Sequence, residues 1–241
     1  MSAVRVLSFD TATDDTVVAS VDGGRTAFEK VVSPGERPLH SQMLLQLAAE
    51  AVAAVGGWEE LDLIAVGTGP GTFTGIRIAV ATGAGLSASS GVPAVGVPTL
   101  DALARSIGAR AGAERVMPLL DARRGEVFGG LHRGDGEPLE EPFAISPARL
   151  IERLAAESRT EGAPLVAGPG AVRFRDELLR AGLVTEPDGS PVHRLDGRSI
   201  CELGAAAERT GPETLKPLYL RIPDAQLWLE RDGKNIDPPP D

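Results

Sequence analysis

The sequence has a single cysteine, Cys201, and contains no run of about 20 apolar residues, the length that a bilayer-spanning helix requires. One cysteine excludes a disulfide within the chain and is typical of a protein in a reducing compartment. Positive charge is scarce as well, with 24 Lys and Arg against 34 Asp and Glu and a net charge of −10. Because a protein that binds nucleic acid alone needs clustered cations, we expect any RNA to be held mainly by another subunit.

No export signal is visible in the first residues, which read MSAVRVLSFD. A secretory signal has a basic region followed by a long apolar segment. We therefore expect neither a signal peptide nor a membrane contact, and a cytoplasmic protein. The length of 241 residues fits one large or two small domains.

Strand and helix patterns follow one another in an order that repeats. In the first half we expect strands at 4–9, 17–21 and 26–32, a helix at 39–55, a strand at 63–66, a helix at 76–90 and a strand at 94–97. In the second half we expect a helix at 99–110, strands at 116–121 and 126–132, a helix from 147, a strand at 165–167, helices at 171–181 and 198–210, and a strand at 215–221.

This order predicts an α/β fold of two related β-β-β-α-β-α domains. The first domain comprises residues 1–98 together with about 212–231, the second comprises 99–211, and a disordered tail follows at 232–241. The tail ends in DPPPD, a composition that cannot bury enough apolar surface to fold.

The segment GTGPGTFTGIR at 67–77 is the most informative, because it leads into a helix with almost no polar face. Arg77 is the only charged residue between 76 and 90. Small residues recur there at four-residue steps in two stripes, Ala79, Gly83 and Ser87, and Ala81, Gly85 and Ser89. A helix that is apolar or small all round must be covered all round. We expect one side to pack on its own sheet and another to admit a helix of a second chain.

The same glycines do not form a known phosphate-binding loop. No lysine follows Gly75, so the contact that a P-loop makes with the γ-phosphate is missing, and the third glycine of a dinucleotide fingerprint is absent. Thr72 and Thr74 are instead predicted to cap the helix, with Gly71 and Gly75 allowing close backbone approach.

Six segments carry a resemblance to a known family. They are LSFDTATDDTVVAS (7–20), HSQMLL (40–45), GTGPGTFTGIRIAVATGAGLS (67–87), VPTLDALA (97–104), LLDARRGEVF (119–128) and LKPLYLR (215–221). Together they cover both halves of the chain, and it resembles the bacterial TsaB (YeaZ) family. The resemblance implies the actin, Hsp70 and sugar-kinase (ASKHA) fold.

It also implies the function of a non-catalytic scaffold or activator in the complex that transfers threonylcarbamoyl to adenosine 37 of tRNA. The implied partners are TsaD, which carries the chemistry in a heterodimer, and TsaE, which supplies the ATPase. The chain itself would bind no cofactor tightly, would form a homodimer when alone, and would meet tRNA only through the complex. The alternatives are an ATP-dependent kinase or acyl transferase of the same fold, or a peptidase.

In this superfamily the first hairpin binds phosphate, which makes Asp10, Thr11 and Thr13 candidates for a vestigial nucleotide loop, with Asp121 and Arg123 in the partner loop. The alternative for the first loop is an ordinary polar hairpin turn, which Asp and Thr favour. The partner loop has two arginines where a cradle needs small residues, so we expect no tight ATP binding.

His40 begins a helix, but residue 44 is leucine, so the histidine pair of a helical metal site is missing. We expect no metal and no catalytic residue, and His40 to make a surface or interface hydrogen bond. Neither a His-Glu-x-x-His motif nor a Gly-x-Ser-x-Gly elbow is present to support a peptidase. The resemblance assigns partner contacts to the two N-terminal helices, where we predict this set: His40, Met43, Leu47, Phe73, Ile76, Val80, Gly83 and Ala84.

Overall fold

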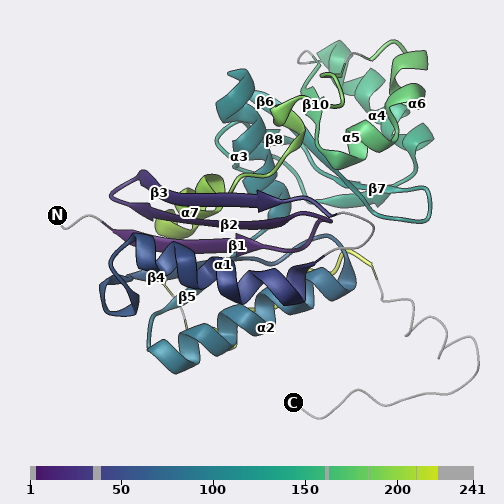
Figure 1. Cartoon of the computed structure of the whole chain (residues 1–241). Helices are drawn as coiled ribbons and strands as arrows, with labels where there is room; N and C mark the ends of the chain where they lie inside the picture. Colours follow the sequence, from purple (N-terminus) through teal and green to yellow (C-terminus); the bar gives the residue numbers. More distant parts are fainter. Residues whose placement is uncertain (1–3, 35–38, 161–162, 184, 210, 222–241) are drawn as a thin grey trace, which may run out of the picture.

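The computed structural model describes residues 4–34, 39–160, 163–183, 185–209 and 211–221 (Figure 1). The first half contains β1 (Arg5–Asp10), β2 (Thr16–Asp22), β3 (Arg25–Val32), α1 (His40–Ala54), η1 (Trp58–Glu60), β4 (Leu63–Gly67), α2 (Phe73–Ser90) and β5 (Ala94–Val97). The second half contains α3 (Thr99–Ala111), β6 (Arg115–Asp121), β7 (Val127–Gly129), β8 (His132–Arg133), β9 (Phe143–Ile145), α4 (Pro147–Thr160), β10 (Leu165–Ala167), α5 (Pro169–Arg173), α6 (Arg175–Arg180), η2 (Pro191–His193), α7 (Gly197–Ala206) and η3 (Pro212–Thr214).

The first sheet has the strand order β3-β2-β1-β4-β5. β1, β2 and β3 form the antiparallel meander that the sequence predicts, and β4 and β5 run parallel to β1. Phe9 of β1 lies opposite Val18 of β2 on one side and Val66 of β4 on the other. Because β1 is central, its carboxyl end, at Asp10, meets the loop that follows β4.

Both faces of the central strands β1, β2 and β4 are buried, which explains why these strands read as nearly continuous apolar runs, whereas β3 at the edge is largely exposed. On one face Leu7, Phe9 and Ile64 pack against α1 and α2. On the other face Val6 and Ala65 pack against residues of α3 and α7. Figure 1 shows α1 and α2 together on one side of the sheet and α7 on the opposite side.

The second sheet has the order β10-β6-β7-β9, and β8 also pairs with β6. β6, β7 and β9 are antiparallel and β10 is parallel to β6, so the meander restarts after α3 as the sequence predicts. A separate apolar cluster joins this sheet to α4, α5 and α6. Two mixed sheets with helices between them form the ASKHA fold.

The predicted strand at 215–221 is wrong. The chain forms η3 just before this segment and is irregular from 215 to 221, where the Leu218 amide donates to the Thr68 carbonyl at 2.8 Å. Pro217 lies in the middle of the segment and has no N–H to give to a strand ladder. Leu215 nevertheless anchors it, because its side chain is buried in the cluster under α2.

Three other elements differ in extent. The predicted strand 126–132 is divided into β7 and β8, which pair with opposite ends of β6. The predicted helix 171–181 is interrupted at Phe174, whose ring is buried, and becomes α5 and α6. The helix expected at 198–210 ends at Ala206, while residue 210 and the tail at 232–241 lie outside the described residues.

α7 falls within the predicted second domain, 99–211, but packs on the first sheet. Gly197 and Gly204 touch this sheet so closely that an added Cβ would lie 2.5 Å from Ala19 and Ala65 respectively. The Ser8 hydroxyl donates to the Gly197 carbonyl at 2.7 Å. α7 therefore ties the end of the second half to the central strands of the first.

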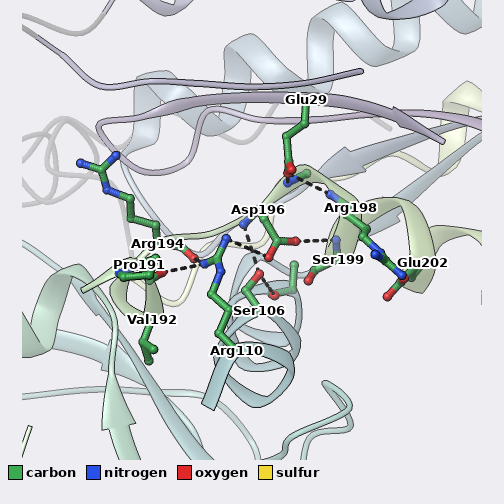
Figure 2. Close-up of polar contacts among 12 residues, drawn as sticks. Glu29, Ser106, Arg110, Pro191, Val192, Arg194, Asp196, Arg198, Ser199 and Glu202 are labelled. Carbon is green, nitrogen blue, oxygen red and sulfur yellow. Dashed lines mark hydrogen bonds and ion pairs between the residues drawn. The ribbon is translucent and has the colours of Figure 1, made fainter. Parts of the chain in front are cut away.

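A polar network fixes the start of α7 (Figure 2). The Asp196 carboxylate accepts from the Ser199 amide at 2.7 Å, which caps the helix, and pairs with Arg110 of α3 at 3.0 Å. Glu29 of β3 accepts from the Gly197 amide at 2.8 Å. Helix α7 is thus held by charged groups from a strand and from a neighbouring helix.

Within the part of the chain that the structure describes, no helix has both the length and the apolar character needed to cross a membrane.

Candidate functional site

The Asp10 carboxylate is a structural anchor at the end of β1. It is completely buried, accepts from the Ala12 amide at 2.6 Å and accepts from the Thr99 hydroxyl at 2.6 Å. Burial raises the pKa of Asp10, while the hydrogen bonds from Thr99 and Ala12 favour the ionised form. Thr99 in turn accepts from the Gly69 amide at 3.0 Å. Both carboxylate oxygens are therefore engaged by the protein itself, and neither is exposed.

The glycine block packs directly on this first loop. A Cβ on Gly67 would overlap the Asp10 carboxylate, and a Cβ on Gly71 would overlap the Ala12 carbonyl. The close backbone approach predicted for Gly71 is therefore confirmed, and Gly75 shows the same tight packing against Thr11. The loop spacing follows from the absence of side chains at these positions.

Of the two threonines predicted to cap α2, only one does so. Thr72 is the N-cap, and its hydroxyl accepts from the Gly75 amide at 3.2 Å. Thr74 lies inside the first turn of the helix and is exposed. The prediction is wrong for Thr74, because the helix begins one residue before it, at Phe73.

A cleft of about 140 Å³ lies between the first loop and the β6–β7 hairpin. Thr13, Asp121 and Arg123 line it, whereas Asp10 and Thr11 are buried beneath it. The Arg123 guanidinium spans the cleft, at 2.6 Å from the Asp14 carboxylate and 3.1 Å from that of Asp121. The protein's own cation thus occupies the position between the two loops.

His40 is buried at the first residue of α1. Its Nδ1 lies 2.8 Å from the Thr16 hydroxyl oxygen. Burial lowers the pKa of His40, and the nearby Asp14 carboxylate opposes that shift. Among the described residues, no group of three or more His, Cys, Asp or Glu side chains is arranged to hold a metal ion.

Helices α1 and α2 lie on the same face of the first sheet, and each has an exposed outward side. On α1, Leu45 is 59% exposed although it is a large apolar residue. On α2, Ala81, Gly85 and Ala88 are exposed, and a Cβ added at Gly85 would meet nothing within 4 Å. Arg77 near the start of the helix remains the only charge on α2.

The predicted partner residues divide between the inside and the outside of this surface. Buried members are His40, Leu47, Ile76 and Gly83. Half-buried or exposed members are Met43, Phe73, Val80 and Ala84. A Cβ at Gly83 would lie 2.5 Å from Val66, so this glycine faces the sheet and not a partner.

The stripe Ala79, Gly83 and Ser87 is the inner one, and the stripe Ala81, Gly85 and Ser89 is the outer one. The four-residue spacing identifies both stripes but cannot say which of them faces the sheet. Leu45 is not identified from the sequence. The apolar period of α1 runs through Leu44 and Leu47, which are buried, and it does not indicate what covers Leu45.

The chain is similar in sequence and in structure to known proteins. The family model described as TsaD, tRNA N6-adenosine threonylcarbamoyltransferase, matches residues 35–169. A tRNA threonylcarbamoyladenosine biosynthesis protein of Escherichia coli, TsaB, is 29% identical over 239 residues, which cover 96% of this chain and all of that protein. An uncharacterised protein of Mycobacterium tuberculosis is 32% identical over 92% of this chain and 93% of its own length. The solved structure of YeaZ from Pseudomonas aeruginosa superposes with a TM-score of 0.73 at 27% identity, over 91% of this chain and 100% of that one.

The chain belongs to the TsaB (YeaZ) family. The curated TsaB proteins of Escherichia coli and Bacillus subtilis are both named for threonylcarbamoyladenosine biosynthesis in tRNA. In this TsaB family member the glycine block serves the packing of two loops, and the outer stripe of α2 faces outward.

Proposed function

We propose that this chain is a non-catalytic subunit in the formation of threonylcarbamoyladenosine on tRNA, and that it pairs with a TsaD-type transferase through the outward surface of α1 and α2. TsaD carries the chemistry and TsaE hydrolyses ATP, while this chain holds TsaD in its working conformation. It binds no cofactor tightly, pairs with itself when TsaD is absent, meets tRNA as part of the complex, and works in the cytoplasm.

The composition of the α1–α2 surface supports pairing. Leu45 projects from α1, and the outer stripe of α2 is small and uncharged, which lets another helix approach closely. An exposed patch of this kind marks interaction sites in soluble proteins. If the two helices bury about 800 Å² on each partner, a stable interface of ordinary size results.

The cleft between the two loops supports a role without catalysis. A phosphate entering it has to displace the Arg123 guanidinium from Asp14. It then meets the carboxylates of Asp14, Asp15 and Asp121, which also line the cleft and repel an anion. The carboxylate of Asp10 is completely buried and accepts from Thr99 and Ala12, so it lies below the cleft and does not offset this repulsion with a metal ion unless the loop opens.

The test is co-purification with the TsaD of the same organism, followed by light scattering and a tRNA modification assay with and without this chain. We expect a heterodimer that replaces the self-pair and restores modification. Gly85→Leu should abolish pairing, because the new side chain projects from the outer stripe. Gly189→Leu is the matched control, since it adds the same side chain at an exposed glycine outside α2 where a Cβ also meets nothing. Unchanged pairing of Gly85→Leu would refute this interface.

The rival is an ATP-using kinase or acyl transferase. Calorimetric titration of the isolated chain with ATP distinguishes it from a scaffold. Saturable binding at micromolar affinity, lost in Asp121→Ala, would overturn the non-catalytic role. We expect no micromolar binding of ATP that depends on Asp121.

A further inference from the structure

A second cavity, of about 410 Å³, opens at the start of α2, next to the loop cleft. Three segments singled out in the sequence meet there: the glycine block through Phe73 and Ile76, the β6–β7 hairpin through Arg123 and Arg124, and the segment after η3 through Tyr219 and Arg221. Its volume is within the range of about 300–1,000 Å³ that is usual for small-molecule sites. Pairing through α1 and α2 does not account for this convergence.

One wall of the cavity is a pair of aromatic rings held at the surface. The rings of Phe73 and Tyr219 have centroids 5.3 Å apart, and the side chains are 37% and 38% exposed. The Arg77 guanidinium lies 3.8 Å from the Phe73 ring centroid and donates to the Tyr219 hydroxyl at 3.1 Å. Exposed aromatic rings fixed in this way offer a platform on which a flat ring can stack.

The charged side chains in the described lining of the cavity are all basic. Its described lining contains Arg123, Arg124 and Arg221 and no acidic residue, in a chain whose net charge is −10. Burial and, after it, the positive charge of Arg124 lower the pKa of Arg221. An anion beside these two guanidinium groups would relieve their repulsion. Arg221 also pairs with Glu126, and Arg123 with Asp14 and Asp121, so a ligand would share these groups with the protein.

An anion combined with a flat ring describes a nucleotide better than an acidic peptide, because a carboxylate alone makes no use of the aromatic wall. Arginines bind phosphate in bidentate fashion, and bases stack on aromatic side chains in single-stranded nucleic acid sites. We infer that this cavity binds a nucleotide, with the base against Phe73 and Tyr219 and the phosphate against Arg124 and Arg221. The ligand is either a free mononucleotide or one unit of an RNA strand, and only the second source rests on the proposed function.

The test uses the full chain and two probes at low salt, AMP by calorimetry and a labelled single-stranded RNA heptamer by fluorescence anisotropy. Arg124→Glu should weaken binding at least tenfold through the reversed charge. Tyr219→Ala should weaken it about tenfold, as expected for one lost stacking contact. Arg25→Glu, at the exposed first residue of β3, is the control with the same change of charge and should stay within twofold.

Binding of AMP without binding of the RNA would identify a free nucleotide as the ligand, and binding of the RNA alone would identify a strand. AMP that displaces the RNA would show that both use this cavity. Absence of saturation with both probes, or equal weakening by Arg124→Glu and Arg25→Glu, would overturn the inference. Light scattering with TsaD is the separate readout: Arg124→Glu should retain pairing, and Gly85→Leu should lose pairing but keep nucleotide binding. The two proposals can therefore fail independently.

Discussion

Gly75 and Thr11 hold the two loops of the first domain in contact. The Thr11 hydroxyl donates to the Gly75 carbonyl at 2.7 Å, and the Thr11 carbonyl fills the space that a Cβ on Gly75 would occupy. Both residues are buried. This contact fixes the position of the first turn of α2 relative to the loop after β1.

Replacement of Gly75 by Ala should therefore destabilise the protein, by about 2 kcal/mol or more, because the methyl group forces two backbones apart. Gly85→Ala, in the same helix, should do the opposite and stabilise it by about 0.5–1 kcal/mol through helix propensity. Urea denaturation of both variants measures the difference. Equal free energies of unfolding for the two variants would contradict the packing described for Gly75.

Asp196→Ala should cost about 2 kcal/mol, since it removes the cap of α7 and leaves Arg110 without this carboxylate. The control is Arg198→Ala, which breaks only the more exposed pair between Arg198 and Glu202 on the surface of α7 (Figure 2). That change should cost less than about 0.5 kcal/mol. A larger loss for Arg198→Ala than for Asp196→Ala in chemical denaturation would refute the role given to the cap.

His40 should make stability depend on pH. Burial holds its pKa below the value of 6.5 expected in the unfolded chain. As the pH falls, the unfolded state takes up the proton first, so the free energy of unfolding should decrease below about pH 6.5. Denaturation at several pH values should give a shallower slope for His40→Gln than for the unaltered protein. Parallel slopes would show that His40 does not contribute.

Cys201 should be inert in the folded protein. Burial raises its pKa to about 12, and its thiol faces the Val6 carbonyl under the first sheet. Because the thiolate is the reactive form, iodoacetamide should label it at pH 8 only as fast as the chain unfolds. Mass spectrometry of timed samples, with and without urea, measures this rate. Rapid labelling without urea would contradict the burial of Cys201.

The strands and helices of the first half could be predicted because apolar runs and glycine turns are local signals. The close approach of Gly71 could also be predicted, since a glycine directly before a helix cap indicates a backbone position with no room for a side chain. The path of residues 215–221 could not, because Leu215 is held by tertiary burial under α2 while Pro217 prevents strand pairing. Nor could the convergence of Tyr219 with Phe73, which are 146 positions apart in sequence and meet only in the folded chain.

The inner and outer stripes of α2 should respond differently to bulky substitutions, because one packs on the sheet and the other is exposed. A larger residue at Gly83 would clash with Val66 in the sheet of the monomer itself, whereas a larger residue at Gly85 meets nothing within 4 Å and, under the proposed pairing, would disturb only the complex. A scan of bulky substitutions along α2 should therefore alternate between insoluble variants and soluble solitary ones. The positions that give soluble variants would identify the outward side of α2.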